Sequence, residues 1–348
     1  MTIVAEKYDY TVGVDTHAAT HTYAIIDAKT GAVIESASFP TTAPATARAL
    51  GWIQRRTTGD VLIAAEGTSS YGARMASTFA AEGLQVCEVK PPGRQARAGR
   101  GKSDQIDAIA AGRTAVGLDV RRLTQPRAAG TRAALRVLLA ARRSMDTRRT
   151  ADRNALNALV RGFDLGVDAR AALRDGQVSA IAGWRTRATD DEATAVIRAE
   201  ARRLAAGILD LTRQLKENKA VLSRLVDELA YGIQELLGVG PVTAAIILTA
   251  YSHHGRIRSE AAFAALAGVS PIPASSGNTI RHRLNRHGDR QLNQALDVIA
   301  RVRMRQDSQT QAYVQRRSRE GKTIRDIRRC LKRIIARQIY RTLQRLMA

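Results

Sequence analysis

The chain has 348 residues, of which 45% are hydrophobic and 4% aromatic, so its length favours two domains plus a connector, with cores of Ala, Leu, Ile and Val. Its 55 Lys and Arg against 32 Asp and Glu give a net charge of +23, which favours nucleic acid held through its phosphates. Two cysteines are too few for a disulfide framework, and the lack of a secretory signal or long apolar run predicts a cytoplasmic, nucleoid-associated protein without a membrane partner.

Residues 1–125 alternate between strand-like and helix-like patterns. Three strand-like runs, YTVGVD, THTYAIID and AVIESASF, occupy residues 8–40, and VLIAA and LQVCEV follow as further strands. Helical patterns lie at 44–57, near 71–82 and from KSDQIDA onward, where Ser103 suits an N-cap. Three strands followed by alternating helices and strands predict an α/β domain with a mixed sheet.

Residues 126–232 form the predicted connector and carry no clear strand pattern. A basic helix is expected over 128–162 and a second long helix over 191–232. Apolar residues recur along the second helix in alternating steps of four and three, with Asn218 as the polar member of the series. Such a heptad seam fits a coiled coil between chains, and it fits equally well a hairpin with the helix at 128–162.

Residues 233–348 are expected to form a mainly helical C-terminal domain. The segment LLGVGPVTAAIILTA resembles a helix-hairpin-helix, in which turn amides, here at Gly238 and Gly240, meet a DNA phosphate; an ordinary tight hairpin is the other interpretation. Beyond residue 280, cations far outnumber acids, which favours phosphate binding over a merely solvated face. The candidate contacts there are Arg281, Arg283, Arg286 and Arg290.

Acidic residues fall at positions that a folded α/β domain would bring together. Asp15 and Glu66 each end an apolar strand, and sites in open α/β sheets form outside the carboxyl ends of strands. Asp104 and Asp107 are three residues apart on one helix face. Grouped carboxylates suit Mg²⁺ or Mn²⁺, and paired ions can assist phosphodiester cleavage. Singly, each acid has a structural explanation, such as a turn or a helix start.

A Gly-rich basic loop, PPGRQARAGRGKSD, directly precedes the second pair of acids. Its cations could bring phosphates to the carboxylates, although a solvated loop of the same composition would look no different. The candidate phosphate contacts in it are Arg94, Arg97, Arg100 and Lys102.

A Ser-Ser-Gly sequence, Ser275 to Gly277, precedes the basic segment of the C-terminal domain. By composition it is a loop. An activated serine can nevertheless attack a phosphodiester and form a covalent intermediate.

Several motifs resemble, in order, those of the insertion-sequence one-ten transposases, which are similar to the Piv-type DNA invertases: VGVDTH, AAEGTSSYG, KSDQIDA, LLGVGPVTA, LAGVSPIPASSG and NRHGDRQLNQAL. The resemblance covers both ends of the chain, and the middle contributes only its helical character. It implies a RuvC-like (RNase H-like) N-terminal domain that binds Mg²⁺ through the DEDD set Asp15, Glu66, Asp104 and Asp107. It also implies a nucleophilic serine, carried over to Ser276, with Ser275 as the alternative. Asn285 departs from the pattern, which has a small hydroxyl residue before the basic-Gly element.

The resemblance implies a DNA transposase that exchanges donor and target DNA strands through a phosphoserine intermediate. It further implies a homo-oligomer, dimer or tetramer, guided by a bridge RNA from the element. Two other classes remain open: a Holliday-junction-type metal nuclease in which water attacks, and a non-catalytic nucleic-acid-binding protein. A covalent protein–DNA adduct would separate the first two classes, and a lack of cleavage with any divalent metal would indicate the third.

Overall fold

The computed structural model describes residues 2–90, 103–127, 129–185, 187–275, 277, 282–283, 285 and 287–348. The chain divides into two compact units, residues 1–129 and 130–348. The predicted connector and C-terminal domain thus fall within one unit, and their division into separate domains stays a prediction. No helix among the described residues is both long and apolar enough to cross a lipid bilayer.

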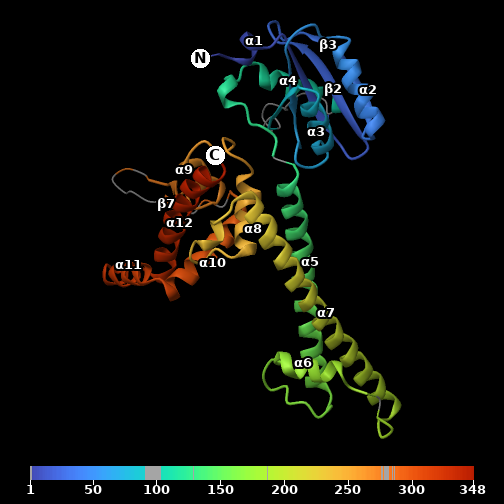
Figure 1. The fold of residues 1–348 in the computed structure, drawn as a ribbon, viewed down its shortest axis with the longest axis vertical. Coiled ribbons are helices and arrows are strands. Elements are labelled where there is room, and N and C mark those ends of the chain that lie inside the picture. Colours follow the sequence, from blue (N-terminus) through green and yellow to red (C-terminus); the bar gives the residue numbers. More distant parts are fainter. Residues whose placement is uncertain are drawn as a thin grey trace. The chain divides into compact units, whose positions relative to one another are not determined.

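The first unit is built on a five-stranded sheet in the order β3-β2-β1-β4-β5 (Figure 1). The central strand β1 pairs antiparallel with β2 and parallel with β4, so the predicted mixed sheet is confirmed. Apolar runs such as VLIAA are buried throughout, as expected for strands covered on both faces. The strands are β1 (Tyr10–Thr16), β2 (Thr20–Asp27), β3 (Val33–Pro40), β4 (Val61–Ala65) and β5 (Gln85–Glu88).

Helices cover both faces of this sheet. On one face, α2 (Ala43–Gln54) and α3 (Ala73–Ala81) pack in a cluster that includes Val14 and Ile63. On the other face, α4 (Asp104–Val116) packs in a cluster with Leu62 and Ala64, the alternate residues of β4. The described residues of the unit also form two short elements, α1 (Val4–Lys7) and the 3₁₀ turn η2 (Val120–Arg122).

Helix α4 crosses the sheet in backbone contact with β1, and this contact requires glycine. A Cβ atom on Gly13 would lie 1.9 Å from the carbonyl oxygen of Ala108 and 2.4 Å from the nitrogen of Gly112. A Cβ atom on Gly112 would lie 2.5 Å from Cδ1 of Ile26. The helix begins at the predicted N-cap Ser103, whose hydroxyl accepts a hydrogen bond from the amide of Ile106. The contact fixes where the first turn of α4 meets the sheet.

The second unit begins with a helical hairpin. Helix α5 (Thr131–Gly162) and helix α7 (Glu192–Leu229) pack side by side, joined through α6 (Asp175–Ala182) (Figure 1). The heptad seam of α7 is buried from Leu204 to Leu222, and Nδ2 of Asn218 donates to the carbonyl of Leu138 in α5 at 3.1 Å. The structure therefore favours the hairpin within one chain, and a coiled coil between chains is not confirmed.

The rest of the second unit is mainly helical, as predicted, around a cluster that includes Tyr251 and Phe263. The helix predicted just before the Gly-Val-Gly-Pro turn is only a 3₁₀ turn, because Gly232 and Gly238 adopt φ of 86° and 87° and interrupt helical geometry. The elements are η3 (Ile233–Glu235), α8 (Pro241–Tyr251), α9 (Glu260–Leu266), β6 (Ile272–Pro273), β7 (His282–Arg283), α10 (Arg290–Gln306), α11 (Ser308–Arg319) and α12 (Ile324–Leu346).

Candidate metal centre

Asp15 and Glu66 lie side by side at the carboxyl ends of two parallel strands. Val14 and Ala65 are register partners, and the amide of Glu66 donates to the carbonyl of Val14 at 3.3 Å. Because side chains alternate along a strand, Asp15 shares the face of Gly13, and Glu66 continues the face of Leu62 and Ala64. This is the face that α4 covers.

The first turn of α4 brings the second pair of acids to the same place. Asp104 opens the helix and Asp107 follows one turn later. Burial raises the pKa of the Asp15 carboxyl; His17 offsets part of this rise, and the negative charges of Asp107 and Asp104 add to it. The structure therefore brings Asp15 into electrostatic contact with both acids of the helix.

His17 joins this cluster and was not among the residues predicted from the sequence. Its Nε2 lies 3.0 Å from Oδ2 of Asp15 and 3.6 Å from Oδ1 of Asp104. Ligand atoms from these three residues all lie within 4.8 Å of one another. The sequence offered a signal, because His17 directly follows β1 and lies two residues after Asp15, the spacing at which extended residues share a face. The two carboxylates fit the oxygen preference of Mg²⁺ or Mn²⁺, whereas an imidazole nitrogen is a ligand that softer divalent ions prefer.

The sequence also predicted residues that contact DNA and a nucleophilic serine. Seven of them lie outside the described residues: Arg94, Arg97, Arg100, Lys102, Ser276, Arg281 and Arg286. Gly277 adopts φ of 54°, a left-handed conformation that favours glycine. Arg283 on β7 and Arg290 at the start of α10 are both exposed.

Asn285, which departs from the family pattern, has a local structural role. Its Oδ1 accepts a hydrogen bond from the amide of His287 at 2.9 Å, in an Asx turn just before α10. A small hydroxyl residue makes the same kind of turn more weakly, so the departure preserves the local backbone geometry.

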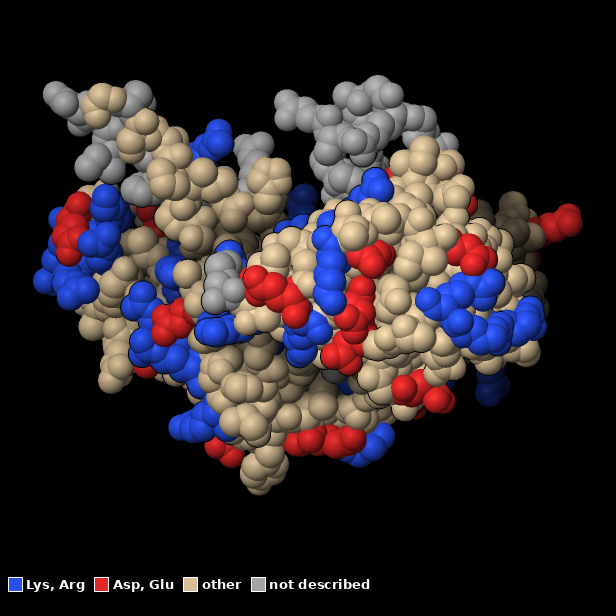
Figure 2. All heavy atoms as spheres, turned by 90° about the horizontal axis from the view of Figure 1, so that it is seen from above, with Lys and Arg blue, Asp and Glu red and all other residues tan. Residues whose placement is uncertain are grey.

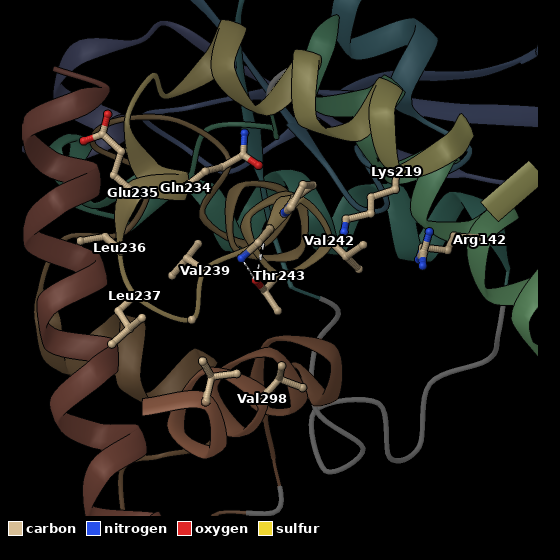
Figure 3. Close-up of a pocket in the computed structure, with 14 residues that line it drawn as sticks. Arg142, Lys219, Gln234, Glu235, Leu236, Leu237, Val239, Val242, Thr243 and Val298 are labelled. Atoms are coloured by element: carbon tan, nitrogen blue, oxygen red, sulfur yellow. Dashed lines mark hydrogen bonds between the residues drawn. The ribbon is translucent and has the colours of Figure 1, made fainter. Parts of the chain in front are cut away.

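The turn before α8 lines a cavity of about 580 Å³ (Figure 3). Gly238 is required there by its positive φ and by Ile299, whose carbonyl oxygen would lie 3.1 Å from an added Cβ. The amide of Gly240 donates to Oγ1 of Thr243 at 2.9 Å, so this predicted phosphate donor is already used within the chain. Figure 3 shows Arg142 and Lys219 on one side of the cavity. Neither cation was predicted from the sequence, because each belongs to a helix outside the motif.

Some of the Lys and Arg side chains on the protein surface form ion pairs with acidic side chains. Figure 2 shows Lys and Arg side chains in several separate patches on the visible face, with Asp and Glu beside them. On α12, Arg337 and Arg341 both pair with Glu260, at 2.9 Å and 2.7 Å, and Arg328 pairs with Asp297 at 3.1 Å. Part of the Arg-rich helix is therefore engaged within the fold, which reduces the number of cations that remain for phosphates.

Two protein-family models match the chain. The model described as Transposase, of the DEDD type found in IS110 elements, matches residues 12–163, and the model described as Transposase IS116/IS110/IS902 family matches residues 230–315. The first match contains all four predicted acids, and the second contains the turn before α8 and the Ser-Ser-Gly sequence. No curated protein gave a significant match.

Proposed function

The chain belongs to the IS110 family of transposases, and from that premise we propose how it acts on DNA. The family makes it a DNA transposase of an insertion sequence, which cuts and rejoins DNA. We propose that this reaction passes through a phosphoserine intermediate, supported by a metal ion at Asp15, Glu66, Asp104 and Asp107. The strand order β3-β2-β1-β4-β5 supports the RuvC-like (RNase H-like) interpretation of the first unit.

The convergence of Asp15, His17 and Asp104 carries this proposal. Their ligand atoms lie within 4.8 Å of one another, and Glu66 lies in register beside Asp15. Like-charged carboxylates held together are costly without a cation, which supports binding of a divalent ion. Mg²⁺ or Mn²⁺ bound there would stabilise negative charge as it develops on the scissile phosphate. The side chains of Asp15, Glu66, Asp104 and Asp107 would hold the ion in place and so align the phosphate.

Ser276 is the proposed nucleophile, in line with the family match over residues 230–315. Its Oγ forms a bond to phosphorus as the bond to the leaving DNA oxygen breaks, and the serine proton passes to that oxygen. A hydroxyl of the second strand then attacks the phosphoserine, which releases the serine and rejoins the DNA. The phosphoserine ester replaces the phosphodiester bond that was broken, so that the strands can be rejoined. Attack by water would leave a cut strand instead. We further infer a homo-oligomer guided by a bridge RNA. The net charge of +23 supports the binding of the RNA.

A trapped covalent adduct tests the nucleophile. The full-length protein, with the RNA encoded beside its gene, is given a nicked suicide substrate carrying an end of its element in Mg²⁺ or Mn²⁺. We expect an adduct with the wild type and with the matched control Ser275→Ala, and none with Ser276→Ala. Peptide mapping of the adduct then identifies the linked residue. Cleavage without an adduct would instead indicate a water-using nuclease, and a complete lack of cleavage would indicate a binding protein.

Asp15→Asn tests the metal centre, because it removes a charge and leaves the size of the side chain unchanged. We expect metal-dependent cleavage to be lost while the protein stays folded. Asp9→Asn is a suitable control, since Asp9 precedes β1 at the opposite end of the strand, where its Oδ2 accepts from the amide of Asp60 at 3.1 Å. Cleavage by Asp15→Asn at the same rate as by an active Asp9→Asn control would rule out the proposed centre.

A further inference from the structure

A row of polar side chains crosses the sheet from the metal centre to its edge. Asp15 on β1 is the register partner of Thr22 on β2, and Thr22 is the register partner of Ser38 on the edge strand β3. Register partners point to the same face, so all three side chains lie on the face that α4 covers. Ser36 lies two residues before Ser38 and shares that face. The row places hydroxyl groups directly beside the acids.

A cavity of about 470 Å³ opens over this row. It is contained within the first unit and shares Asp104 with the metal centre, so the two sites are continuous. The first turn of α4 provides its other wall through Ser103 and Gln105. The lining residues are Thr22, Ser36, Ala37, Ser38, Ser103, Asp104 and Gln105.

Hydrogen bonds within the cavity leave hydrogen-bond donors available. Oγ1 of Thr22 and Oγ of Ser38 share one hydrogen bond of 2.8 Å, which uses one of their two hydroxyl hydrogens. The amide of Gln105 donates to Oγ of Ser36, so the Ser36 hydroxyl keeps its own hydrogen. Oγ of Ser103 likewise accepts, from the amide of Ile106 at 3.2 Å. A cavity with spare neutral donors suits a ligand rich in acceptor oxygens.

We propose that this cavity binds the sugar–phosphate unit that neighbours the scissile phosphate. The hydroxyl hydrogen that the Thr22–Ser38 pair leaves free, and that of Ser36, donate to DNA backbone oxygens. The inference rests on the proposed function, because it takes the acids as the cleavage centre. Serine and threonine are regular donors to phosphates. Thr22 and Ser38 stand one and two strand spacings from Asp15, about 5 Å and 10 Å, which is the range of an adjacent nucleotide.

Neutral donors suit this place better than cations. A Lys or Arg beside Asp15 and Asp104 would pair with the carboxylates and compete with the divalent ion. Hydroxyls can bind a backbone oxygen without neutralising the metal ligands. In this proposal the acids hold the ion, and the hydroxyls of Thr22, Ser36 and Ser38 align the DNA strand.

The test removes both hydroxyls in the double variant Thr22→Val/Ser38→Ala. Full-length protein with its RNA is assayed on a supercoiled plasmid carrying the ends of its element, and cleavage rates are measured against DNA and Mg²⁺ concentrations. We expect the KM for DNA to rise about tenfold or more, because the variant loses a hydrogen bond to a charged oxygen of the DNA backbone. The Mg²⁺ concentration at half-maximal rate and the affinity for the RNA should stay at wild-type values.

Two controls separate this effect from a structural one. Thr22→Ser keeps a hydroxyl and should retain the wild-type KM. Thr57→Val removes a hydroxyl that lies away from the cavity, before the amino end of β4, where it donates to the carbonyl of Ile53. This variant should also leave KM unchanged. If the double variant does not fold, the single variants Ser36→Ala and Ser38→Ala, at partly exposed and exposed positions, provide the same KM test.

The outcomes distinguish this inference from the proposed function. Wild-type KM in folded hydroxyl variants would overturn the inference and leave the metal centre intact. A shifted Mg²⁺ requirement with unchanged KM would also overturn it, by assigning the hydroxyls to support of the acids. Weaker RNA binding with unchanged KM would do so as well. A wild-type protein that cleaves no DNA with any divalent metal would remove the proposed function, and the inference with it.

Discussion

Gly13 of β1 lies against Gly112 of α4 so closely that neither position has room for a side chain. The oxygen of Gly112 also accepts a hydrogen bond of 3.4 Å from Oγ1 of Thr11. From Gly112 the helix runs back toward the carboxyl end of β1, which brings Asp104 to within reach of His17. The two glycines therefore set the distance between the acids of the sheet and those of the helix.

Gly13→Ala should disrupt both the fold and the metal centre. Its Cβ would meet the backbone at 1.9 Å, so α4 must move, at a cost of about 1–3 kcal/mol or more. We expect lower unfolding free energy in urea and a raised Mg²⁺ requirement for cleavage. Gly51→Ala is the matched control, because a Cβ there meets only the end of the Arg55 side chain. Full metal affinity in a destabilised Gly13→Ala protein would show that the contact does not position the acids.

His17→Ala should weaken binding of the divalent ion. The imidazole lies between Asp15 and Asp104, and loss of a ligand or of a residue that orients a ligand costs about 10- to 100-fold in metal affinity. The measurement is the Mn²⁺ concentration that gives half-maximal cleavage, with the exposed His254→Ala as control. An unchanged or lower half-maximal concentration would mean that His17 takes no part in holding the ion.

Asn218→Ala should destabilise the hairpin and leave the oligomeric state unchanged. Asn218 is buried, donates to the carbonyl of Leu138 at 3.1 Å and accepts from Arg142 at 3.5 Å. Leaving these groups without a partner costs about 1–3 kcal/mol in unfolding free energy. The exposed Lys216→Ala is the control. A change in mass by light scattering, without loss of stability, would favour a seam between chains instead.

His253 should make the second unit less stable in mild acid. Burial lowers the pKa of His253 from its ordinary 6.5, and the positive charges of Arg256 and Arg132 lower it further. As pH falls below 6.5, the unfolded chain takes up a proton that the folded chain resists, so stability is lost between 6.5 and the lowered folded pKa.

His253→Gln should therefore flatten the dependence of unfolding free energy on pH, which is at most about 1.4 kcal/mol per pH unit for one group. Urea unfolding at intervals between about pH 7 and pH 5 measures this slope. His254→Gln, at the exposed neighbouring position, should retain the wild-type slope. Identical slopes in wild type and His253→Gln would contradict the assignment.

Much of the first unit follows from local sequence patterns. Apolar runs that end in Asp15 and Glu66 predict strands with acids at their carboxyl ends, and Ser103 marks the start of α4. These features depend on neighbours in the chain, which a single sequence displays directly. The same patterns predict the two long helices, because periodicity over many turns is hard to mistake.

Features that depend on strand register could not be predicted in the same way. The row from Asp15 through Thr22 to Ser38 exists only once three strands are paired, and a shift of one residue would turn every side chain to the other face. The need for glycine at Gly13 and Gly112 arises from a contact between distant segments. The seam around Asn218 had two possible partners, and only the tertiary fold distinguishes them.

The chain enters and leaves the α5–α7 hairpin at one end, where Oγ1 of Thr131 donates to Glu228 at 2.8 Å. Leu222 belongs to the core of the C-terminal helices, whereas Leu156 belongs to a separate core that includes residues of α6. Matched insertions or deletions of seven residues in both helices would therefore alter neither core. The length of the α5–α7 hairpin can therefore change in evolution without affecting the acids around Asp15. We expect relatives to differ most in this length.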